Sequence, residues 1–157
     1  MTTEQSEMSI SMKNTADNRP RVFFDTNILL DYVLFRNDES LAAEYIFDAS
    51  LDCKLDLFIA AHSLTNIFYA LRKEFPVAEQ RQVVRLLCSL CNVRPISADN
   101  IEKAIDSGYT SNLEDALQIQ CAIESDCDYF ITRDHELFEK CPVRTLLPHE
   151  LVRELSL

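Results

Sequence analysis

The sequence predicts a three-layer α/β/α domain with a central parallel sheet of four to five strands. Short apolar runs alternate with segments whose apolar residues recur at helical spacing, and this order implies parallel strands joined by helices. The run Val22-Phe23-Phe24 is unbroken, as is typical of a strand covered on both faces. The chain has 157 residues, 47% of them hydrophobic, which fits one domain that buries about 68–70% of its unfolded surface.

The individual elements follow from the period of the apolar residues. Strands are expected at residues 22–24, 57–60, 93–97, 128–132 and 143–147. Longer helices are expected at residues 28–35, 39–50, 63–74, 76–91, 112–125 and 148–157. A shorter helix is expected between a Ser97 cap and Gly108, the only glycine, which suits a left-handed helix end.

Two helix details are also predicted from the sequence. In the second helix, Leu41, Tyr45 and Ala49 share one face and are expected to be buried. Ser63 is expected to cap the helix that follows the second strand, and Thr26 or Asn27 to cap the first helix.

The organisation of the chain is expected to be simple. Residues 1–20 are polar and are predicted to be a disordered leader, with a single folded domain over residues 21–157. Neither a secretory signal nor a run of transmembrane length is visible, so no membrane association is expected. The six cysteines lie mostly in helix-like apolar surroundings, which favours a reducing, cytoplasmic location. Cys88 and Cys91 lie within a predicted helix, and no second pair or nearby His completes a zinc site.

The net charge of −11 argues against indiscriminate binding to nucleic acid, which depends on Lys and Arg. A local basic track is still compatible with this charge. Four basic residues are concentrated in one region, namely Arg72, Lys73, Arg81 and Arg85. An ordinary solvated helical face explains them equally well.

Three acidic residues are expected to converge at one edge of the sheet. Asp25 directly follows the first strand, and Asp134 lies two residues beyond the fourth. The helix at residues 112–125 is joined to the fourth strand by only two residues, so it runs antiparallel to that strand. Its length of about 20 Å then brings Asp115 level with the end of the strand.

Each acid also has an ordinary structural explanation. Asp25 could cap a helix, Asp115 could complete a capping box with Asn112, and Asp134 could close a turn. Three carboxylates at one place, however, repel one another unless a cation lies between them. Oxygen ligands favour Mg²⁺ or Mn²⁺, and such an ion can promote hydrolysis of a phosphodiester.

Residues 21–151 resemble the PIN domain family, metal-dependent ribonucleases that include VapC-type toxins. The matching motifs are Asp25-Thr26-Asn27, Ser63-Leu64-Thr65-Asn66, Glu114-Asp115-Ala116-Leu117 and Thr132-Arg133-Asp134. The resemblance implies that Asp25, Asp115 and Asp134 hold the metal ion. It also implies that Thr132 orients the cluster by hydrogen bonding.

Asn66 departs from the common family pattern, in which many members carry Glu at this position. The amide can ligate a metal through its oxygen or orient a water, but it cannot act as a carboxylate base. Glu114 is expected to restore the missing charge. A branch of the family resembles this chain in combining Ser-x-x-Asn with Glu-Asp.

The sequence therefore predicts an endoribonuclease that uses Mg²⁺ or Mn²⁺, and Arg36 and Arg133 are expected to bind substrate phosphate. By analogy with the toxins, a small antitoxin is expected to cover the acidic groove, and a homodimer is compatible with the analogy. A second hypothesis is a PIN-like module that binds RNA or protein with little catalysis. A third is a phospho-accepting receiver or a dehalogenase-like phosphatase, which also place an Asp at a strand tip, although the neighbouring residues that those families need are absent.

Overall fold

The computed structural model describes residues 18–157. The leader predicted at residues 1–20 lies outside the described residues except for 18–20. In that short part, the Pro20 carbonyl accepts a hydrogen bond from the Asp56 amide at 2.9 Å, and Arg19 pairs with the Asp56 carboxylate at 3.4 Å. Arg19 and Pro20 therefore already contact the sheet before β1 begins.

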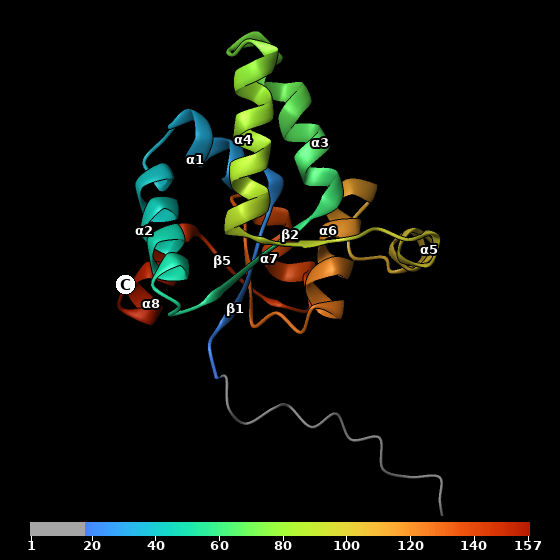
Figure 1. The fold of residues 1–157 in the computed structure, drawn as a ribbon. Helices are drawn as coiled ribbons and strands as arrows, with labels where there is room; N and C mark the ends of the chain where they lie inside the picture. Colours follow the sequence, from blue (N-terminus) through green and yellow to red (C-terminus); the bar gives the residue numbers. More distant parts are fainter. Residues whose placement is uncertain (1–17) are drawn as a thin grey trace, which may run out of the picture.

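The described residues form an all-parallel sheet of five strands in the order β3-β2-β1-β4-β5. The strands are β1 (Arg21–Phe24), β2 (Asp56–Ala60), β3 (Asn92–Arg94), β4 (Tyr129–Ile131) and β5 (Arg144–Leu146). Since β1 is central, it pairs with β2 on one side and with β4 on the other (Figure 1). The predicted parallel sheet is confirmed, and the residues that follow β1 and β4 lie next to each other at its carboxyl edge.

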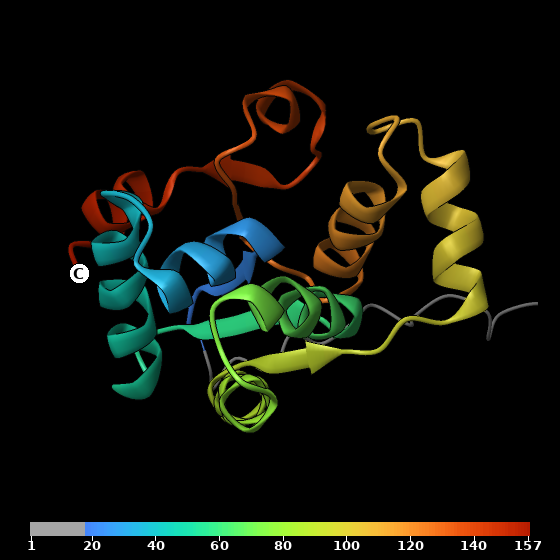
Figure 2. The same cartoon turned by 90° about the horizontal axis from the view of Figure 1, so that it is seen from above.

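The helices are α1 (Thr26–Leu34), α2 (Glu39–Leu51), α3 (Ala61–Ala70), α4 (Val77–Leu90), α5 (Ala98–Asp106), α6 (Leu113–Glu124), α7 (His135–Lys140) and α8 (Pro148–Leu155), with a short 3₁₀ turn, η1 (Leu71–Lys73), after α3. They lie on both faces of the sheet, as Figures 1 and 2 show, so the predicted three-layer fold is confirmed. No helix within residues 18–157 has both the length and the apolar character needed to cross a bilayer.

Successive residues of β1 point to opposite faces of the sheet and belong to two separate cores. Val22 and Phe24 pack with residues of α1, α2, α3, α4 and α8. Phe23 packs with residues of α6 and α7, and its ring stacks on that of Phe130 with centroids 5.5 Å apart. Both faces of β1 are therefore covered, which explains why its sequence is a continuous apolar run.

Several predicted helix ends are confirmed. The Ser97 hydroxyl accepts from the Asn100 amide, and the Asn100 side chain accepts from the Ser97 amide, which forms a reciprocal cap at the start of α5. Gly108 has φ +67°, the left-handed conformation expected of it. The Asn112 side chain accepts hydrogen bonds from the first amides of α6.

The predicted buried face of α2 is wrong for two of its three residues. Leu41 and Tyr45 are each 49% exposed, whereas Ala49 is buried as expected. The helix packs against α1 and α8 through the neighbouring stripe, which includes Ala43 and Phe47. Ala43 allows close helix contact beside Phe47, so the stripe that contains Leu41 and Tyr45 does not form the buried face.

Three further local predictions are corrected. Helix α3 begins at Ala61, so Ser63 lies inside its first turn and does not cap it. The residue that precedes α1 is Asp25, so neither Thr26 nor Asn27 caps that helix. The segment after Asp134, expected to be a turn, forms the short helix α7, which the Asp134 carboxylate caps by accepting from the Glu136 amide.

Candidate active site

A pocket of about 360 Å³ opens beside the carboxyl end of β1. It is lined by Asp25, Thr26, Asn27, Leu30, Asn66, Tyr69, Glu114 and Asp115. These residues come from the end of β1 and the first half of α1, from α3 and from the first turn of α6. Four of the predicted site residues therefore meet although they are far apart in the chain.

Asp25 is almost fully buried, at 3% exposure, and other side chains hold its carboxylate in place. The Thr132 hydroxyl donates to Oδ2 at 2.7 Å, and the Gln118 amide group donates to Oδ1 at 3.1 Å. Burial is the largest influence on this group and raises the pKa of Asp25, while these two hydrogen bonds oppose the rise. A nearby positive charge would favour the ionised form.

A second set of hydrogen bonds joins α1, α3 and α6 around Thr26. The Thr26 amide and hydroxyl both donate to Gln118 Oε1, and the hydroxyl lies 2.7 Å from the Ser63 hydroxyl. Glu114 Oε1 accepts from the Thr26 hydroxyl at 3.1 Å and from the Asn66 amide group at 3.0 Å. Asn66 therefore acts here as a donor that orients the carboxylate of Glu114.

The charge at the site is concentrated around Asp115. Burial, followed by repulsion from Asp25, Glu114, Asp134 and Glu136, raises the pKa of Asp115 from 3.8 to about 6. These carboxylates come from β1, α6 and α7, so the predicted gathering of acids at one sheet edge is present. Asp134 takes part through its charge, and its Oδ1 also caps α7 by accepting from the Glu136 amide at 3.0 Å.

The residues fit a hydrated divalent ion better than a metal fully enclosed by protein ligands. Within residues 18–157, no three Asp, Glu, His or Cys side chains are grouped closely enough to enclose a metal ion. Mg²⁺ usually keeps several waters and takes only one or two carboxylates directly from a protein. The oxygen-rich lining and the mutual repulsion of the carboxylates match that mode of binding.

The predicted phosphate-binding arginines lie against a buried carboxylate. Asp31 on α1 is 1% exposed, and the Arg36 guanidinium binds its Oδ1 from two nitrogens at 2.9 and 3.0 Å. The Arg133 guanidinium also binds Asp31, through Nε and through Nη2 at 3.1 Å. Both arginines remain about 40% exposed, and neither lines the 360 Å³ pocket. Their binding of substrate stays a prediction.

Sequence reasoning did not find three residues of the site. Gln118 lies one helical turn after Glu114 on α6, so helical spacing alone places both residues on the same face. Tyr69 lies three residues after Asn66 on α3, and the same spacing places these two residues on one face. His62 had no such signal: burial lowers its pKa, and its Nε2 lies 4.0 Å from Glu114 Oε1.

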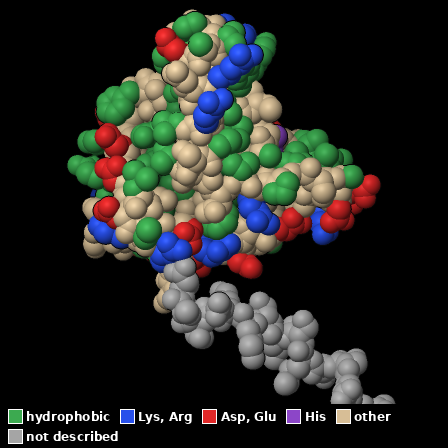
Figure 3. All heavy atoms as spheres, in the orientation of Figure 1, with side chains coloured by type: hydrophobic (Ala, Val, Ile, Leu, Met, Phe, Trp, Pro, Cys, Tyr) green, Lys and Arg blue, Asp and Glu red, His purple; other side chains and the backbone are tan. Residues whose placement is uncertain are grey.

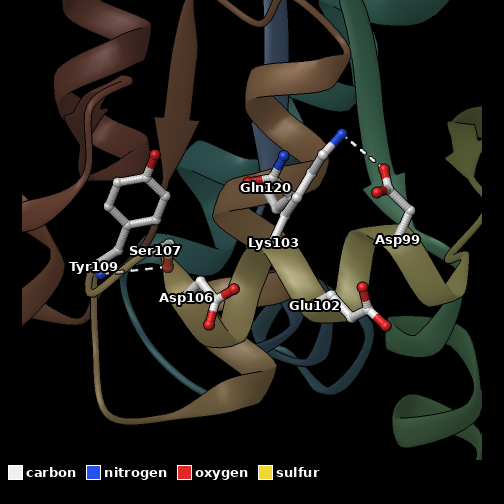
Figure 4. A pocket seen from close by; sticks show the side chains of 7 residues that line it. All are labelled: Asp99, Glu102, Lys103, Asp106, Ser107, Tyr109 and Gln120. Atoms are coloured by element: carbon white, nitrogen blue, oxygen red, sulfur yellow. Dashed lines mark hydrogen bonds and ion pairs between the residues drawn. The ribbon is translucent and has the colours of Figure 1, made fainter.

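A separate hollow of about 410 Å³ lies along α5, with Gln120 of α6 on its other side. Figure 4 shows Lys103 extended toward Asp99, and their charged atoms are 2.7 Å apart. This hollow contains no residue from the matching motifs. It is an exposed, charged surface between two helices.

The comparisons with known proteins agree with this arrangement. A model described as the PIN domain matches residues 21–136, and no curated protein matches the sequence. A toxin–antitoxin complex from Klebsiella pneumoniae is 25% identical, with a TM-score of 0.60 over 81% of this chain and 97% of that chain. PAE2754 from Pyrobaculum aerophilum is 21% identical, with a TM-score of 0.60 over 89% and 98%.

VapC20 of Mycobacterium tuberculosis, a Sarcin-Ricin loop cleaving toxin, is 13% identical, with a TM-score of 0.56 over 69% of this chain and 86% of that chain. These structures share the parallel sheet and the helices around it. The family model covers most of the chain and includes all four matching motifs. The chain belongs to the PIN domain family.

Proposed function

We propose that the protein is a divalent-metal-dependent endoribonuclease that uses Mg²⁺ or Mn²⁺. The observation that carries the proposal is the accumulation of carboxylates around Asp115; burial, and then repulsion from these carboxylates, raises the pKa of that group to about 6. Such an unfavourable arrangement of like charges is typical of a site that binds a cation. VapC20, which shares the fold, is a toxin that cleaves the Sarcin-Ricin loop.

In this proposal Asp25, Asp115 and Asp134 would hold the ion. Once bound, the ion would activate the attacking water and stabilise the charge that develops on the phosphate. Thr132 and Gln118 keep the Asp25 carboxylate in one orientation. A fixed carboxylate loses little freedom on binding and so favours a single metal geometry.

Glu114 supplies the carboxylate that is absent at position 66. Its contacts with Thr26, Asn66 and His62 all involve Oε1. Its other oxygen, Oε2, is therefore the atom proposed to orient the attacking water. The Asn66 amide keeps Glu114 turned in this direction, so its role is to position a neighbouring group.

Partners follow from the solved neighbours and are part of the same proposal. One of the solved neighbours, from Klebsiella pneumoniae, is a toxin–antitoxin complex. We infer that this chain acts as the toxin of such a pair and that an antitoxin segment covers the acidic pocket. Formation of a homodimer is a further expectation that sedimentation of the purified chain would check.

Cleavage of mixed single-stranded RNAs tests the proposal. We expect cleavage that requires Mg²⁺ or Mn²⁺ and that falls at least a hundredfold in the Asp25→Asn variant, because the variant loses the charge that holds the ion. Asp106→Asn is the matched control, since Asp106 is exposed and lines only the separate hollow on α5. Equal activity of Asp25→Asn and wild-type protein would refute the proposed role.

A module that binds RNA without cleaving it is the second candidate, favoured by the amide at position 66 and by the absence of a closed group of three ligands among residues 18–157. The same preparation distinguishes the two. Retention of RNA with no cleavage at any Mg²⁺ or Mn²⁺ concentration would support the binding module over the enzyme.

A further inference from the structure

Tyr69 is an exposed aromatic side chain on the rim of the acidic pocket. It lies on α3, one turn beyond Asn66, and lines the same 360 Å³ pocket as Asp25 and Asp115. Although it borders the pocket, 65% of its surface is exposed. Its ring makes no part of either hydrophobic core, so packing does not explain its position.

A neighbouring cation fixes one side of this ring. The Arg72 guanidinium carbon lies 3.6 Å from the ring centroid, and Arg72 also donates to the Tyr69 carbonyl at 2.7 Å. The guanidinium plane thus covers one face of the ring and is held there by a second contact. The large exposed area of Tyr69 leaves room for another planar group against the ring.

Besides Arg72, three other basic residues belong to the elements next to α3, although the whole chain carries a charge of −11. Figure 3 shows Lys and Arg side chains gathered over the projecting end of α3 and α4. Arg72 and Lys73 belong to η1, and Arg81 and Arg85 belong to α4, which packs against α3. A strand of RNA that reaches the acidic pocket from this side would pass cationic groups before it meets the carboxylates.

We propose that Tyr69, backed by Arg72, is a stacking platform for an unpaired nucleobase next to the scissile phosphate. The inference rests on the proposed nuclease function and specifies its substrate as single-stranded RNA. Aromatic rings bind unpaired bases by stacking, whereas bases within a duplex are already stacked on each other. A cation over the opposite face of the ring strengthens such a platform and attracts the phosphate backbone.

Binding of a fluorescein-labelled single-stranded RNA, measured by anisotropy with EDTA present to prevent cleavage, tests the platform. Tyr69→Ala is expected to raise the Kd by about 5- to 150-fold, the range found when a stacked aromatic residue is removed. Tyr69→Phe keeps the ring and is expected to stay within about twofold of wild type. Tyr45→Ala is the matched control, because Tyr45 is 49% exposed on α2 and lies outside the pocket.

A duplex of the same sequence supplies the second comparison. Tyr69→Ala is expected to leave the Kd for the duplex unchanged, because paired bases cannot stack on the ring. In cleavage assays, the variant is expected to raise KM for single-stranded RNA and to leave kcat largely intact. Circular dichroism of each variant checks that the fold is retained.

The outcomes separate this inference from the proposed function. If wild-type protein cleaves RNA and Tyr69→Ala has an unchanged Kd and KM, the platform is refuted and the nuclease stands; the Tyr69 face is then available to a protein partner. If Tyr69→Ala weakens binding but no preparation cleaves RNA, the platform stands and the nuclease fails. Absence of RNA binding by wild-type protein would refute the platform.

Discussion

Ionised Asp115 lowers the stability of the folded protein. Its carboxylate is half-buried among other carboxylates, and the raised pKa of about 6 records the energy needed to ionise it there. The folded protein therefore holds this proton more tightly than the unfolded chain does. As pH rises from about 4 to 6, the unfolded chain has already released the proton, so stability falls over that window.

The raised pKa of Asp115 predicts that a neutral side chain at this position gives a stabilised but inactive variant. In EDTA at pH 7, Asp115→Asn is expected to raise Tm by about 2–4 °C, equivalent to about 1 kcal/mol in a domain of this size once screening by water is considered. The difference should vanish well below pH 3.8, where Asp115 is protonated in both the folded and the unfolded state. Thermal denaturation over a pH series measures it, with Asp106→Asn as control; a lower Tm for Asp115→Asn at pH 7 would contradict the account.

At the scale of elements, Asp31 joins parts of the chain that follow different strands. It lies on α1, whereas Arg36 lies in the α1–α2 connection and Arg133 lies between β4 and α7. Arg133 is also the residue between Thr132 and Asp134. The buried carboxylate therefore fixes the connection that carries three of the predicted site residues, Thr132, Arg133 and Asp134.

The two arginines are expected to replace each other in part. Removal of either one by Ala leaves Asp31 with one cation and should cost about 1 kcal/mol of unfolding free energy. Removal of both leaves a buried charge unpaired and should cost about 3–5 kcal/mol, more than the sum of the single changes. Urea denaturation of the double-mutant cycle measures this coupling.

The control for that cycle is Lys54→Ala, because Lys54 and Asp52 form an ion pair in which both side chains are more than 60% exposed. Its cost should stay within about 0.5 kcal/mol. Strict additivity of Arg36→Ala and Arg133→Ala would show that Asp31 does not couple them. RNA affinity of the single variants tests separately whether either guanidinium also contacts phosphate.

At the scale of the molecule, the sheet and its layers could be predicted because burial on both faces leaves a direct mark on sequence. The apolar runs at β1 and β2 and the helical period between them determine the parallel fold. The buried face of α2 could not be read in the same way, since Ala43 packs closely while Leu41 stays half-exposed. Which of the two apolar stripes of α2 becomes buried depends on the helices that pack against it, and the sequence of α2 alone does not specify them.

The position of the acidic residues of the candidate site could be predicted, whereas the hydrogen bonds around them could not. Asp25, Asp115 and Asp134 were placed together by strand direction and helix length alone. Gln118, which holds Asp25, belongs to a hydrogen-bond network whose geometry depends on side-chain rotamers in three helices and one strand end. Position along an element can be argued from sequence, whereas the pairing of side chains across elements requires coordinates.

The central claim is that the carboxylates at the edge of the sheet bind one divalent ion. Isothermal titration calorimetry with Mn²⁺ tests it most directly. We expect wild-type protein and Asp106→Asn to take up one ion per chain, and Asp25→Asn and Asp115→Asn to lose that uptake. No detectable uptake by wild-type protein at millimolar Mn²⁺, or the same uptake by Asp25→Asn as by wild type, would contradict it.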